Sequence, residues 1–555
     1  MVETTEAEEE LPVETEIFGV SPNQTTAASL SSHIDALKRA LHLASSNGTQ
    51  RQCLEGSSTP VVEQRQKSQY VRNFPSIRQL KLLIGLYFEE LNPFFPCIEE
   101  QEFMERMEQV RQDLVEDGGG LCLVVRPSSR NFFMLMYMVL AVATYLDSTS
   151  HSQKNAAPPG WQYCLMAEEI SGRDHHTRLL PAELDLIRYY TVKAIYMVHI
   201  EKLTPASHSI AIAIQSAFSA HLNDESTWID CSKSRKHARR LLWWTVFYVD
   251  RRIAQKCWKP YIIRENEFRV GELAVTEEEL LSTVFDLQTH IKVEEQLVIN
   301  RYVQTMIRWA RLWAQVWDSM FAVSSSYGKN RAEEIEVLDA KILYAQRETH
   351  ESLCWDTLFL PTYLATGETD AQIRSRLVAY VRFNLLRLLL RQSWKHTTAA
   401  DARGSQICLE LSNETIEAIV EYMVSQVNPI PFGLNAIECV VECICHLVPH
   451  VNKEKSIFSN SLPMSSFEGA IKFLENLSPK LGAARRALDA LGEIAEKGWP
   501  PSFTSNGQVG GVQEIPCLIN TAVDLGQGSF NELFVPDTWS EICFPSLEEG
   551  QVRIT

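Results

Sequence analysis

The sequence predicts an all-α protein, with a large helical body between two acidic tails. Apolar residues recur at helical spacing through most of residues 74–497. No stretch of useful length alternates between apolar and polar residues, as a half-buried strand would, and no repeat of fixed period is present. A chain of 555 residues, 45% of them hydrophobic, can bury a large core.

Proline and glycine divide the body into separate predicted helices. Pro158, Pro159 and Gly160 mark one boundary, and Pro361 and Pro431 mark two others. The predicted helices span residues 76–92, 99–116, 129–148, 160–172, 182–203, 206–222, 233–257, 276–327, 331–349, 370–396, 411–428, 432–448, 464–477 and 482–497.

The domain organisation follows from shifts in composition. Residues 1–70 are predicted to be a disordered acidic tail and linker, because the first 20 residues hold seven glutamates and no lysine or arginine. Residues 71–330 form the first half of the helical body and residues 331–497 continue it. Residues 498–555 form an acidic-aromatic tail.

This C-terminal tail has the composition of a transcriptional activation segment. Residues 498–552 contain no lysine or arginine, and acidic residues alternate with large aromatic ones. Acidic groups keep such aromatics solvated until a coactivator groove captures them. The predicted anchors are Phe530, Phe534, Trp539 and Phe544. The alternative is a tail that packs its aromatics back on the helical body.

Charge and cysteine usage narrow the protein class. The net charge of −18 argues against a strongly basic grip on DNA phosphates. The 13 cysteines are mostly scattered singly, and the acidic first 20 residues do not resemble a secretory signal, so we expect reduced, buried thiols. Residues 132–146 are nearly all apolar but shorter than the roughly 20 residues of a membrane span, so a buried core helix is predicted.

The stretch from Ala238 to Glu267 organises the chain. On a helix its apolar side chains cover nearly the whole circumference, which predicts a buried helix. The same helix carries Asp250 and Arg251, and buried charges must be paired. We therefore expect both of these side chains to find opposite charges inside the body.

These residues resemble the signature of the fungal-specific transcription factor domain. This domain is the regulatory middle region of fungal zinc-cluster transcription factors, also called the xylanolytic activator regulatory region. The residues that match its signature are Arg240, Trp243, Trp244, Asp250, Arg251 and Pro260. The family form has a glycine two residues before this proline, where this chain has Trp258.

Two further blocks support the resemblance, which covers roughly residues 75–330. Tyr87-Phe88 followed by Pro93, Phe95 and Pro96 is similar to the opening of the family domain. Residues 210–221, which are small and apolar and end in Ala-His, are similar to the helix before the tryptophan pair.

The zinc cluster that reads DNA in this family is absent from the sequence. Such a cluster needs six cysteines with three-residue steps, but no Cys-x-x-Cys occurs and Cys53 stands alone in residues 1–70. No other DNA-binding motif replaces it. We therefore expect no cofactor in this chain and no direct, zinc-dependent DNA binding, unless the full-length transcript encodes a cluster upstream.

Two other groups of residues allow both a functional and a structural interpretation. Lys233, Arg235, Lys236, Arg239 and Arg240 form a basic run that fits either a nuclear import signal or a solvated helix start. Another group lies on one helical stripe that is too long for a single metal ion, so core packing is the favoured interpretation. This group is Cys439, Cys443, His446 and His450, and Pro449 is expected to end the helix before the last of them.

No enzyme is predicted. The nearest all-α rival, a terpene-synthase-like catalyst, needs aspartate-rich magnesium sites. Asn223, Asp224 and Thr227 begin such a pattern, but position 231 is cysteine in place of glutamate. A phosphate loop, a dinucleotide fingerprint and a nucleophile elbow are also missing from the sequence.

The resemblance implies a nuclear transcription regulator of pathway-specific genes, for secondary metabolism or nutrient use. Its helical body would bind a partner or a small effector and control the C-terminal activation segment. Expected partners are the transcription machinery or a coactivator, with a DNA-binding partner or a second copy of the chain, and no membrane. The alternative is a helical ligand-binding protein or enzyme unrelated to transcription.

Overall fold

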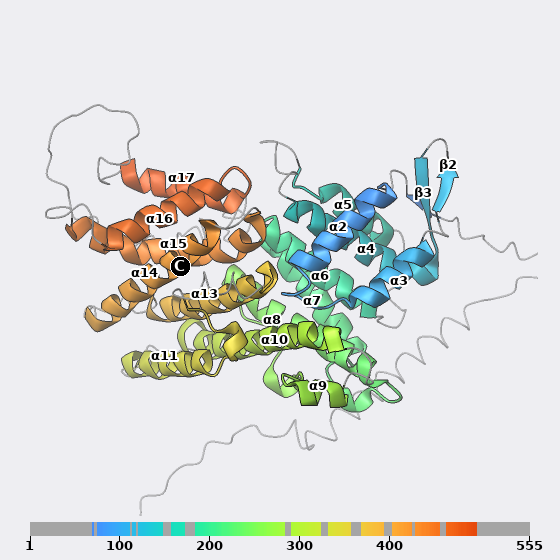
Figure 1. Ribbon diagram of the computed structural model, residues 1–555, viewed down its shortest axis with the longest axis horizontal. Helices are drawn as coiled ribbons and strands as arrows, with labels where there is room; N and C mark the ends of the chain where they lie inside the picture. Colours follow the sequence, from blue (N-terminus) through green and yellow to red (C-terminus); the bar gives the residue numbers. More distant parts are fainter. Residues whose placement is uncertain are drawn as a thin grey trace, which may run out of the picture. The chain divides into compact units, whose positions relative to one another are not determined.

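The described part of the chain forms fifteen α-helices and one small sheet in the computed structural model, so the predicted all-α class is confirmed (Figure 1). The predicted tails, residues 1–70 and 498–555, lie outside the described residues, except that Gln69 and Tyr70 belong to a short strand. The structure describes residues 69–71, 75–110, 114–117, 120–147, 157–172, 184–283, 290–322, 331–356, 368–392, 402–424, 428–454 and 462–496.

The first six helices form one group, and one of them, α4, spanning Arg130–Leu146, is almost fully apolar. Fourteen of its side chains are buried, which confirms the prediction of a core helix at this position. The other helices of the group are α2 (Ile77–Glu90), α3 (Glu100–Val110), α5 (Trp161–Gly172), α6 (Leu184–His199) and α7 (Leu203–Ser219). Of these, α2, α5 and α6 make the main contacts with α4.

Helix α8, spanning Lys233–Cys257, connects this group to the rest of the body because it packs on α6 and α7 and also on α10. The next helices are α9 (Glu277–Thr283), α10 (His290–Val316) and α11 (Arg331–Arg347), and a π-helical turn, Trp317–Phe321, follows α10.

The C-terminal helices pack around α13, which contacts α10, α11, α14 and α15 (Figure 1). Residues from α2 through α17 belong to one continuous hydrophobic core, from Leu80 to Ala487. These last helices are α13 (Asp370–Gln392), α14 (Ala402–Val424), α15 (Ile430–Glu454), α16 (Leu462–Leu477) and α17 (Gly482–Glu496).

Polar side chains fix where several helices begin. Ser76 and Ser232 accept hydrogen bonds from N–H groups three residues later, at 3.3 Å each. At the start of α13, Thr369 and Gln372 cap each other reciprocally, with bonds of 2.8 and 3.3 Å. Local sequence therefore sets these helix starts, and packing on the core stabilises the helices that follow.

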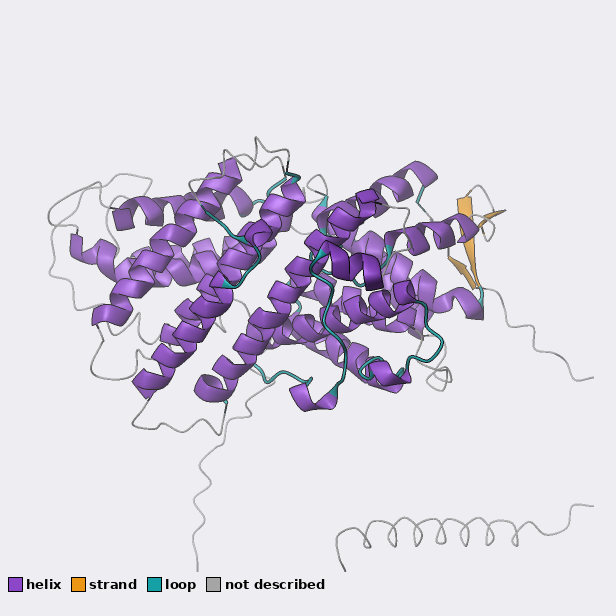
Figure 2. Cartoon of the chain, turned by 60° about the horizontal axis from the view of Figure 1, so that its bottom comes forward, coloured by secondary structure: helices purple, strands orange, loops and turns teal. Residues whose placement is uncertain are grey.

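A three-stranded antiparallel sheet lies at the edge of the helical body (Figure 2). Its strands are β1 (Gln69–Val71), β2 (Leu114–Asp117) and β3 (Gly120–Val125), in the order β1-β3-β2. The predicted helix over residues 99–116 therefore ends at Val110. The sequence analysis missed these strands because three to six residues are too few to show an alternating pattern.

Other helix boundaries also differ from the prediction. The single helix expected over residues 276–327 is described as α9 and α10, with residues 284–289 between them outside the described part. Helix α14 begins at Ala402, nine residues before its predicted start at residue 411. Helix α15 continues to Glu454, so Pro449 does not end it as predicted. Burial of Val451 beyond the proline offsets part of the cost of the missing N–H group.

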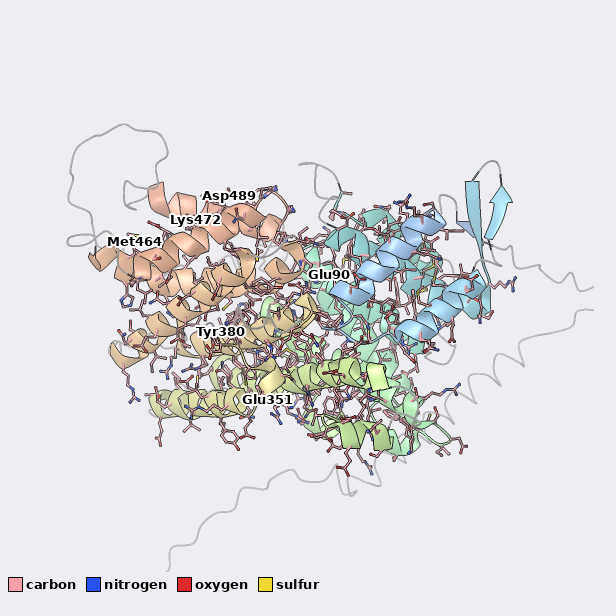
Figure 3. The ribbon with its side chains drawn as sticks, in the orientation of Figure 1. Glu90, Glu351, Tyr380, Met464, Lys472 and Asp489 are labelled. Carbon is pink, nitrogen blue, oxygen red and sulfur yellow. The ribbon has the colours of Figure 1, made fainter. Side chains whose placement is uncertain are left out.

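Five arginines on α13 join distant helices to the body. Arg374 pairs with Glu90 of α2 at 2.5 Å, and Arg387 pairs with Asp339 of α11 at 2.7 Å. Arg391 pairs with Asp339 as well, at 2.8 Å. The remaining two are Arg376, which pairs with Glu368 and donates to the Glu351 carbonyl, and Arg382, which donates to Asn435 of α15. Figure 3 labels Glu90 on α2 and Glu351 beside α13.

Candidate functional site

The two tryptophans of α8 lie in an aromatic cluster at the centre of the body. Trp243 is 0% exposed and Trp244 is 1% exposed, so the prediction that α8 is a buried helix is confirmed. Both rings contact Phe268, with centroids 5.3 and 5.4 Å apart. The indole N–H of Trp244 also donates to the Gly271 carbonyl at 2.9 Å. The tryptophan pair therefore attaches the segment after α8 to the helix itself.

Arg240, near the start of α8, also holds the segment around Gly271, through Glu225. Its guanidinium forms a bidentate pair with Glu225, at 3.0 and 2.5 Å, and Glu225 also accepts the Gly271 N–H at 2.9 Å. Burial favours a higher pKa for Glu225, but the bonds from Arg240 and Gly271 hold that pKa below its ordinary value. An ionised carboxylate thus joins α8 to the segment around residue 271.

Asp250 and Arg251 form an ion pair, at 3.1 Å, that clamps the chain after α8. The Asp250 carboxylate accepts the N–H groups of Ile262 and Ile263, at 2.9–3.1 Å. Arg251 donates to the Ile263 carbonyl at 2.6 Å. Because Asp250 is 2% exposed and Arg251 is 0% exposed, the expectation that each finds an opposite charge inside the body is confirmed.

Aromatic rings and burial complete the surroundings of this pair. The Arg251 guanidinium lies 3.6 Å from the ring centroid of Phe247 and 4.7 Å from that of Tyr261. Burial raises the pKa of Asp250, while Arg251 and the two N–H groups act in the opposite direction. This pair is a structural clamp because its hydrogen bonds go to backbone groups of the same chain.

The turn after α8 shows how Trp258 is accommodated where the family signature has glycine. Trp258 has a left-handed backbone, with φ 48° and ψ 47°, which glycine adopts without strain. Its ring packs against Trp313 and Phe321, with centroids 6.3 and 5.0 Å away. The aromatic contacts offset the cost of the left-handed geometry, and the exposed Pro260 continues the turn.

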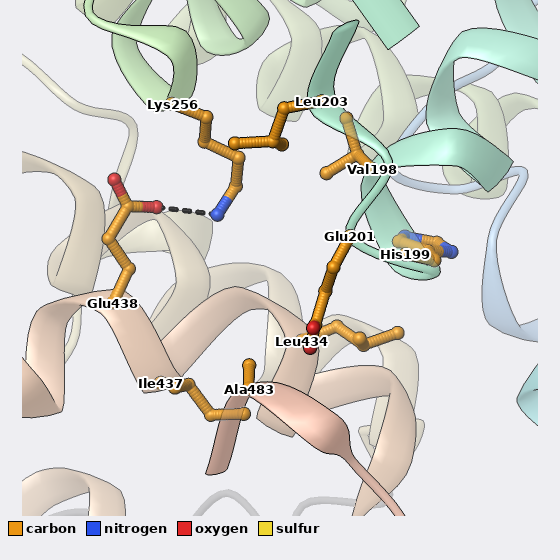
Figure 4. Close-up of a pocket in the computed structure, with 9 residues that line it drawn as sticks. All are labelled: Val198, His199, Glu201, Leu203, Lys256, Leu434, Ile437, Glu438 and Ala483. Atoms are coloured by element: carbon orange, nitrogen blue, oxygen red, sulfur yellow. Dashed lines mark hydrogen bonds and ion pairs between the residues drawn. The ribbon is translucent and has the colours of Figure 1, made fainter. Parts of the chain in front are cut away.

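A small cavity lies where the end of α6 and α8 meet the C-terminal helices (Figure 4). Its volume is about 50 Å³. On one side the ammonium of Lys256 pairs with Glu438 of α15 at 2.7 Å. On the other side Glu201, which pairs with Arg486, extends toward the residues of α15. The other lining residues are Val198, His199, Leu203, Leu434, Ile437 and Ala483.

His199 is the most perturbed base beside this cavity. Burial first, and then Arg252 and Lys256, lower its pKa to about 3. Its ring stacks on Tyr145, with centroids 5.9 Å apart, and its Nδ1 atom is buried without a hydrogen-bond partner. The neutral imidazole therefore has an unused polar atom beside the cavity.

The basic run at the start of α8 is partly structural. Lys233 donates to the Ser282 carbonyl at 2.8 Å, the Arg239 guanidinium lies 5.6 Å from the Trp228 ring, and Arg240 is in the ion pair described above. These contacts support the interpretation of the run as a helix start, and leave Arg235 and Lys236 on its outer side.

The cysteine and histidine stripe of α15 packs in the core. Cys439 and Cys443 are fully buried, and His446 pairs with Glu442 at 3.1 Å. Within the described residues, no group of three or more His, Cys, Asp or Glu side chains could hold a metal ion. The expectation that the thiols are all buried is wrong, because Cys354 and Cys445 are exposed at loop and helix surfaces.

Helix α15 also contains a window with the length and composition of a membrane span, Ile430–Val448. However, 78% of that window is buried inside the fold, which is typical of a core helix. The anchors predicted in the C-terminal tail, Phe530, Phe534, Trp539 and Phe544, lie outside the described residues.

Comparison with known proteins identifies the region that contains these clamps. The family model of the fungal specific transcription factor domain matches residues 84–347. This part of the chain is a fungal specific transcription factor domain. No curated protein matches the chain.

The match to the fungal specific transcription factor domain ends in α11, but residues inside the matched region also contact helices that follow it. Lys256 and Arg252, inside the matched region, bond to Glu438 and Asn435 of α15. Sequence reasoning did not find these partners, because they lie 182 and 183 residues away. It also missed Glu225, the partner of the half-buried Arg240, although an acidic residue shortly before the arginine-rich start of α8 was a usable signal.

Proposed function

We propose that this chain is a nuclear transcription regulator that controls pathway-specific genes, for secondary metabolism or nutrient use. The observation that carries the proposal is the fungal specific transcription factor domain at residues 84–347. The clamps of α8 support it, because they give the signature residues Arg240, Trp243, Trp244, Asp250 and Arg251 a shared role in forming a rigid body.

The helical body would act by binding a partner protein or a small effector. Because the sequence has no zinc cluster, contact with DNA would come from a DNA-binding partner or through a second copy of the chain. The partners on the other side would be a coactivator or the transcription machinery. The chain itself would need no metal cofactor and would not be an enzyme.

Residues 498–555 would supply the activating segment. Large aromatics contribute most of the binding energy in small interfaces, so Phe530, Phe534, Trp539 and Phe544 would be the anchors. The acidic residues between them would mainly speed the encounter with a basic coactivator surface.

A fusion of the full chain to an unrelated DNA-binding module tests the function. We expect nuclear accumulation and activation of a reporter that carries the module's binding site. Phe534→Ala with Trp539→Ala should abolish the reporter signal, whereas the matched control Glu541→Gln should only weaken it. A chain that stays outside the nucleus and leaves the reporter silent would favour the alternative of a ligand-binding protein unrelated to transcription.

A DNA-binding measurement on the chain without the fused module separates the two possible routes to DNA. We expect no sequence-selective binding that a zinc chelator abolishes. Tight binding that disappears with chelator would contradict this proposal.

A further inference from the structure

One face of α2 points away from the helical body. Its buried side chains pack toward the core, with α4 as the main neighbour, and they are Leu80, Leu83, Ile84, Tyr87 and Phe88. The opposite side runs along the surface of the N-terminal group of helices (Figure 1). Leu82 lies on this outer side and is 63% exposed, so a large apolar side chain faces solvent near the middle of the helix.

Four residues form a line along the outer face of α2. Arg78, Leu82, Gly85 and Glu89 follow one another at spacings of four, three and four residues, which places them on one side of a helix. Gly85 is half-buried, and the other three are exposed. These four residues, the outer line, therefore have a positive end and a negative end, with a large and a small residue between them.

The outer line is symmetric about the middle of the helix. Arg78 and Glu89 lie equally far from the midpoint of α2, and the same is true of Leu82 and Gly85. A two-fold axis through this midpoint would bring symmetric positions of two antiparallel helices together. Arg78 would then meet the partner subunit's Glu89 at both ends of the contact. Leu82 would meet the partner subunit's Gly85 twice, near its centre.

The two charged ends are available for such contacts. Arg78 and Glu89 form no ion pair with any other residue in the part of the chain that the structure describes. Glu90, by contrast, already pairs with Arg374 of α13 at 2.5 Å. A second copy of the same face supplies each of the two outer charges with an opposite charge.

Gly85 provides the space that Leu82 needs in this arrangement. A methyl group added at Gly85 would meet no atom of the described residues within 4 Å, so the surface beside it is open. A glycine lets a second helix approach closely, and a leucine of that helix then fills the gap. Lys81 and Leu86 share the same midpoint and form a flanking pair, because the apolar stem of a lysine covers a leucine well.

We propose that the outer line of α2 is a self-association surface, which binds the outer line of a second copy of this chain around a two-fold axis. The charges set the antiparallel direction, because a parallel pair would place Arg78 beside the same residue of its partner. The association itself does not rest on the proposed function. Only its use in gene regulation does.

Sedimentation velocity of the full chain, over a range of micromolar concentrations, tests the surface. A helix of 14 residues offers less contact than the roughly 800 Å² per partner of a standard interface. We therefore expect a weak dimer that dissociates on dilution. A chain that is monomeric at every concentration would refute the proposal and leave this face to another occupant.

Exchange of the two charges tests the direction and register of the contact. Arg78→Glu and Glu89→Arg should each raise the dissociation constant of the dimer about tenfold or more, because each places like charges together at both ends. The double variant should dimerise like the wild type. An equimolar mixture of the two single variants should do so as well, because each mixed dimer again has opposite charges at both ends. If neither combination restores association, the antiparallel arrangement is wrong.

Two further variants test the centre of the contact. Leu82→Ala should weaken dimerisation about tenfold, whereas the matched control Leu462→Ala, at a leucine that is 62% exposed on α16, should not. Equal effects of the two would place the contact elsewhere and refute the proposal. Gly85→Gln should weaken dimerisation and raise the thermal midpoint of dilute protein, because glutamine fills the gap and favours a helix. A variant that is more stable but associates less has not lost its dimer by unfolding.

The sedimentation result is independent of the reporter. A chain that dimerises through α2 but leaves the reporter silent refutes only the proposed function. A chain that activates the reporter but stays monomeric refutes only the self-association surface.

Discussion

Asp250 and Arg251 resolve an electrostatic problem that arises because α8 is buried. An isolated charge in the core is costly, but this carboxylate accepts two backbone N–H groups and one guanidinium bond. The pair therefore stabilises the return of the chain after α8, and each partner depends on the other. The same logic explains Arg240 and Glu225 at the opposite end of the segment.

Removal of one partner should cost more than removal of both. Asp250→Asn leaves the Arg251 charge buried and should destabilise the protein by about 3–5 kcal/mol. The double variant with Arg251→Met should be less destabilised than this single variant, because it carries no unpaired charge. Urea denaturation measures both, with the exposed Asp489→Asn as the control. An additive double variant would contradict the clamp.

Trp243 contributes through packing instead of charge. Its truncation, Trp243→Ala, leaves a cavity beside Phe218 and Phe268 and should reduce the free energy of unfolding by about 3–5 kcal/mol. Tyr344, which is 66% exposed, is the matched control, and Tyr344→Ala should change it by less than about 0.5 kcal/mol. Equal denaturation midpoints for the two variants would show that the aromatic cluster is not part of the stabilising core.

His199 makes the stability of the protein sensitive to acid. Because the pKa in the folded state, about 3, is below the ordinary value of 6.5, folding favours the neutral ring. The resulting stability is present above pH 6.5 and is lost as the pH falls toward 3, at up to about 1.4 kcal/mol per pH unit. Thermal denaturation between pH 7 and 4, in buffers without phosphate or carboxylate, measures this loss.

The variant His199→Phe keeps a ring against Tyr145 but does not titrate, so its stability should fall less steeply with acid. It retains the contribution of His237, whose pKa is lowered by burial to about 4, and the slope should therefore decrease without disappearing. A variant as acid-sensitive as the wild type would show that His199 is already charged in the folded state.

At the scale of elements, the turn that ends α8 has a strained backbone at Trp258, and the aromatic contacts of that side chain offset the strain. The N–H groups of Trp258 and Lys259 donate to the last carbonyls of the helix, at 3.2 and 3.0 Å, which requires the left-handed conformation of Trp258. The family glycine would adopt this geometry freely but would provide no ring for Trp313 and Phe321 to contact.

Two truncations of Trp258 separate the cost of the left-handed backbone from the stabilisation by aromatic contacts. Trp258→Gly and Trp258→Ala both lose the ring and should destabilise the protein, as measured by urea denaturation. The alanine variant should be less stable by about 1 kcal/mol, because alanine keeps the cost of the left-handed backbone that glycine avoids. If the two variants are equally stable, the turn relaxes to another conformation and the strain is not present.

Elements with strong local signals were predictable from the sequence. The bounds of α8, Lys233–Cys257, agree with the prediction because a serine cap precedes a nearly continuous apolar circumference. The short strands were missed because they contain too few residues for a period to show. Pro449 was misread because tertiary packing of Val451 outweighs the local preference to end the helix.

The candidate site was only partly predictable. Burial of Trp243 and the pairing of Asp250 with Arg251 follow from patterns within one helix. The contacts of Arg252, Lys256 and Arg382 with α15 do not, because nothing in a single sequence specifies which residues far along the chain will face them. These contacts therefore appear only in the folded structure.

At the scale of the whole molecule, the family domain and the C-terminal helices share one core. The match to the family ends at residue 347, yet Arg374, Arg387 and Arg391 of α13 bind carboxylates on α2 and α11 inside it. Asn428, at the start of α15, also donates to the Leu146 carbonyl at the end of α4, at 3.0 Å. The matched region therefore depends on later residues for its buried surface.

A chain that ends at residue 356, which removes α13–α17, should not fold cooperatively. Apolar surface of α10 and α11 would lose the cover of α13, and Asp339 would lose both arginine partners. We expect aggregation or a broad thermal transition in calorimetry. The control chain that ends at residue 496 keeps every described helix and should unfold in a sharp transition. A sharp transition for the shorter chain would show that the family domain is autonomous.

The long separations within these ion pairs have a consequence for biosynthesis. Glu90 and Arg374 are 284 positions apart, and translation adds about 5–20 residues per second, so α2 waits on the order of 15–60 s for this partner. Late in that interval α10 and α11 have been synthesised, but α13, which packs on both of them in the native protein, has not. Chaperones that hold unfolded chains would be most needed at this stage of synthesis, and a ribosome that stalls before residue 374 would leave a product prone to aggregate and be degraded.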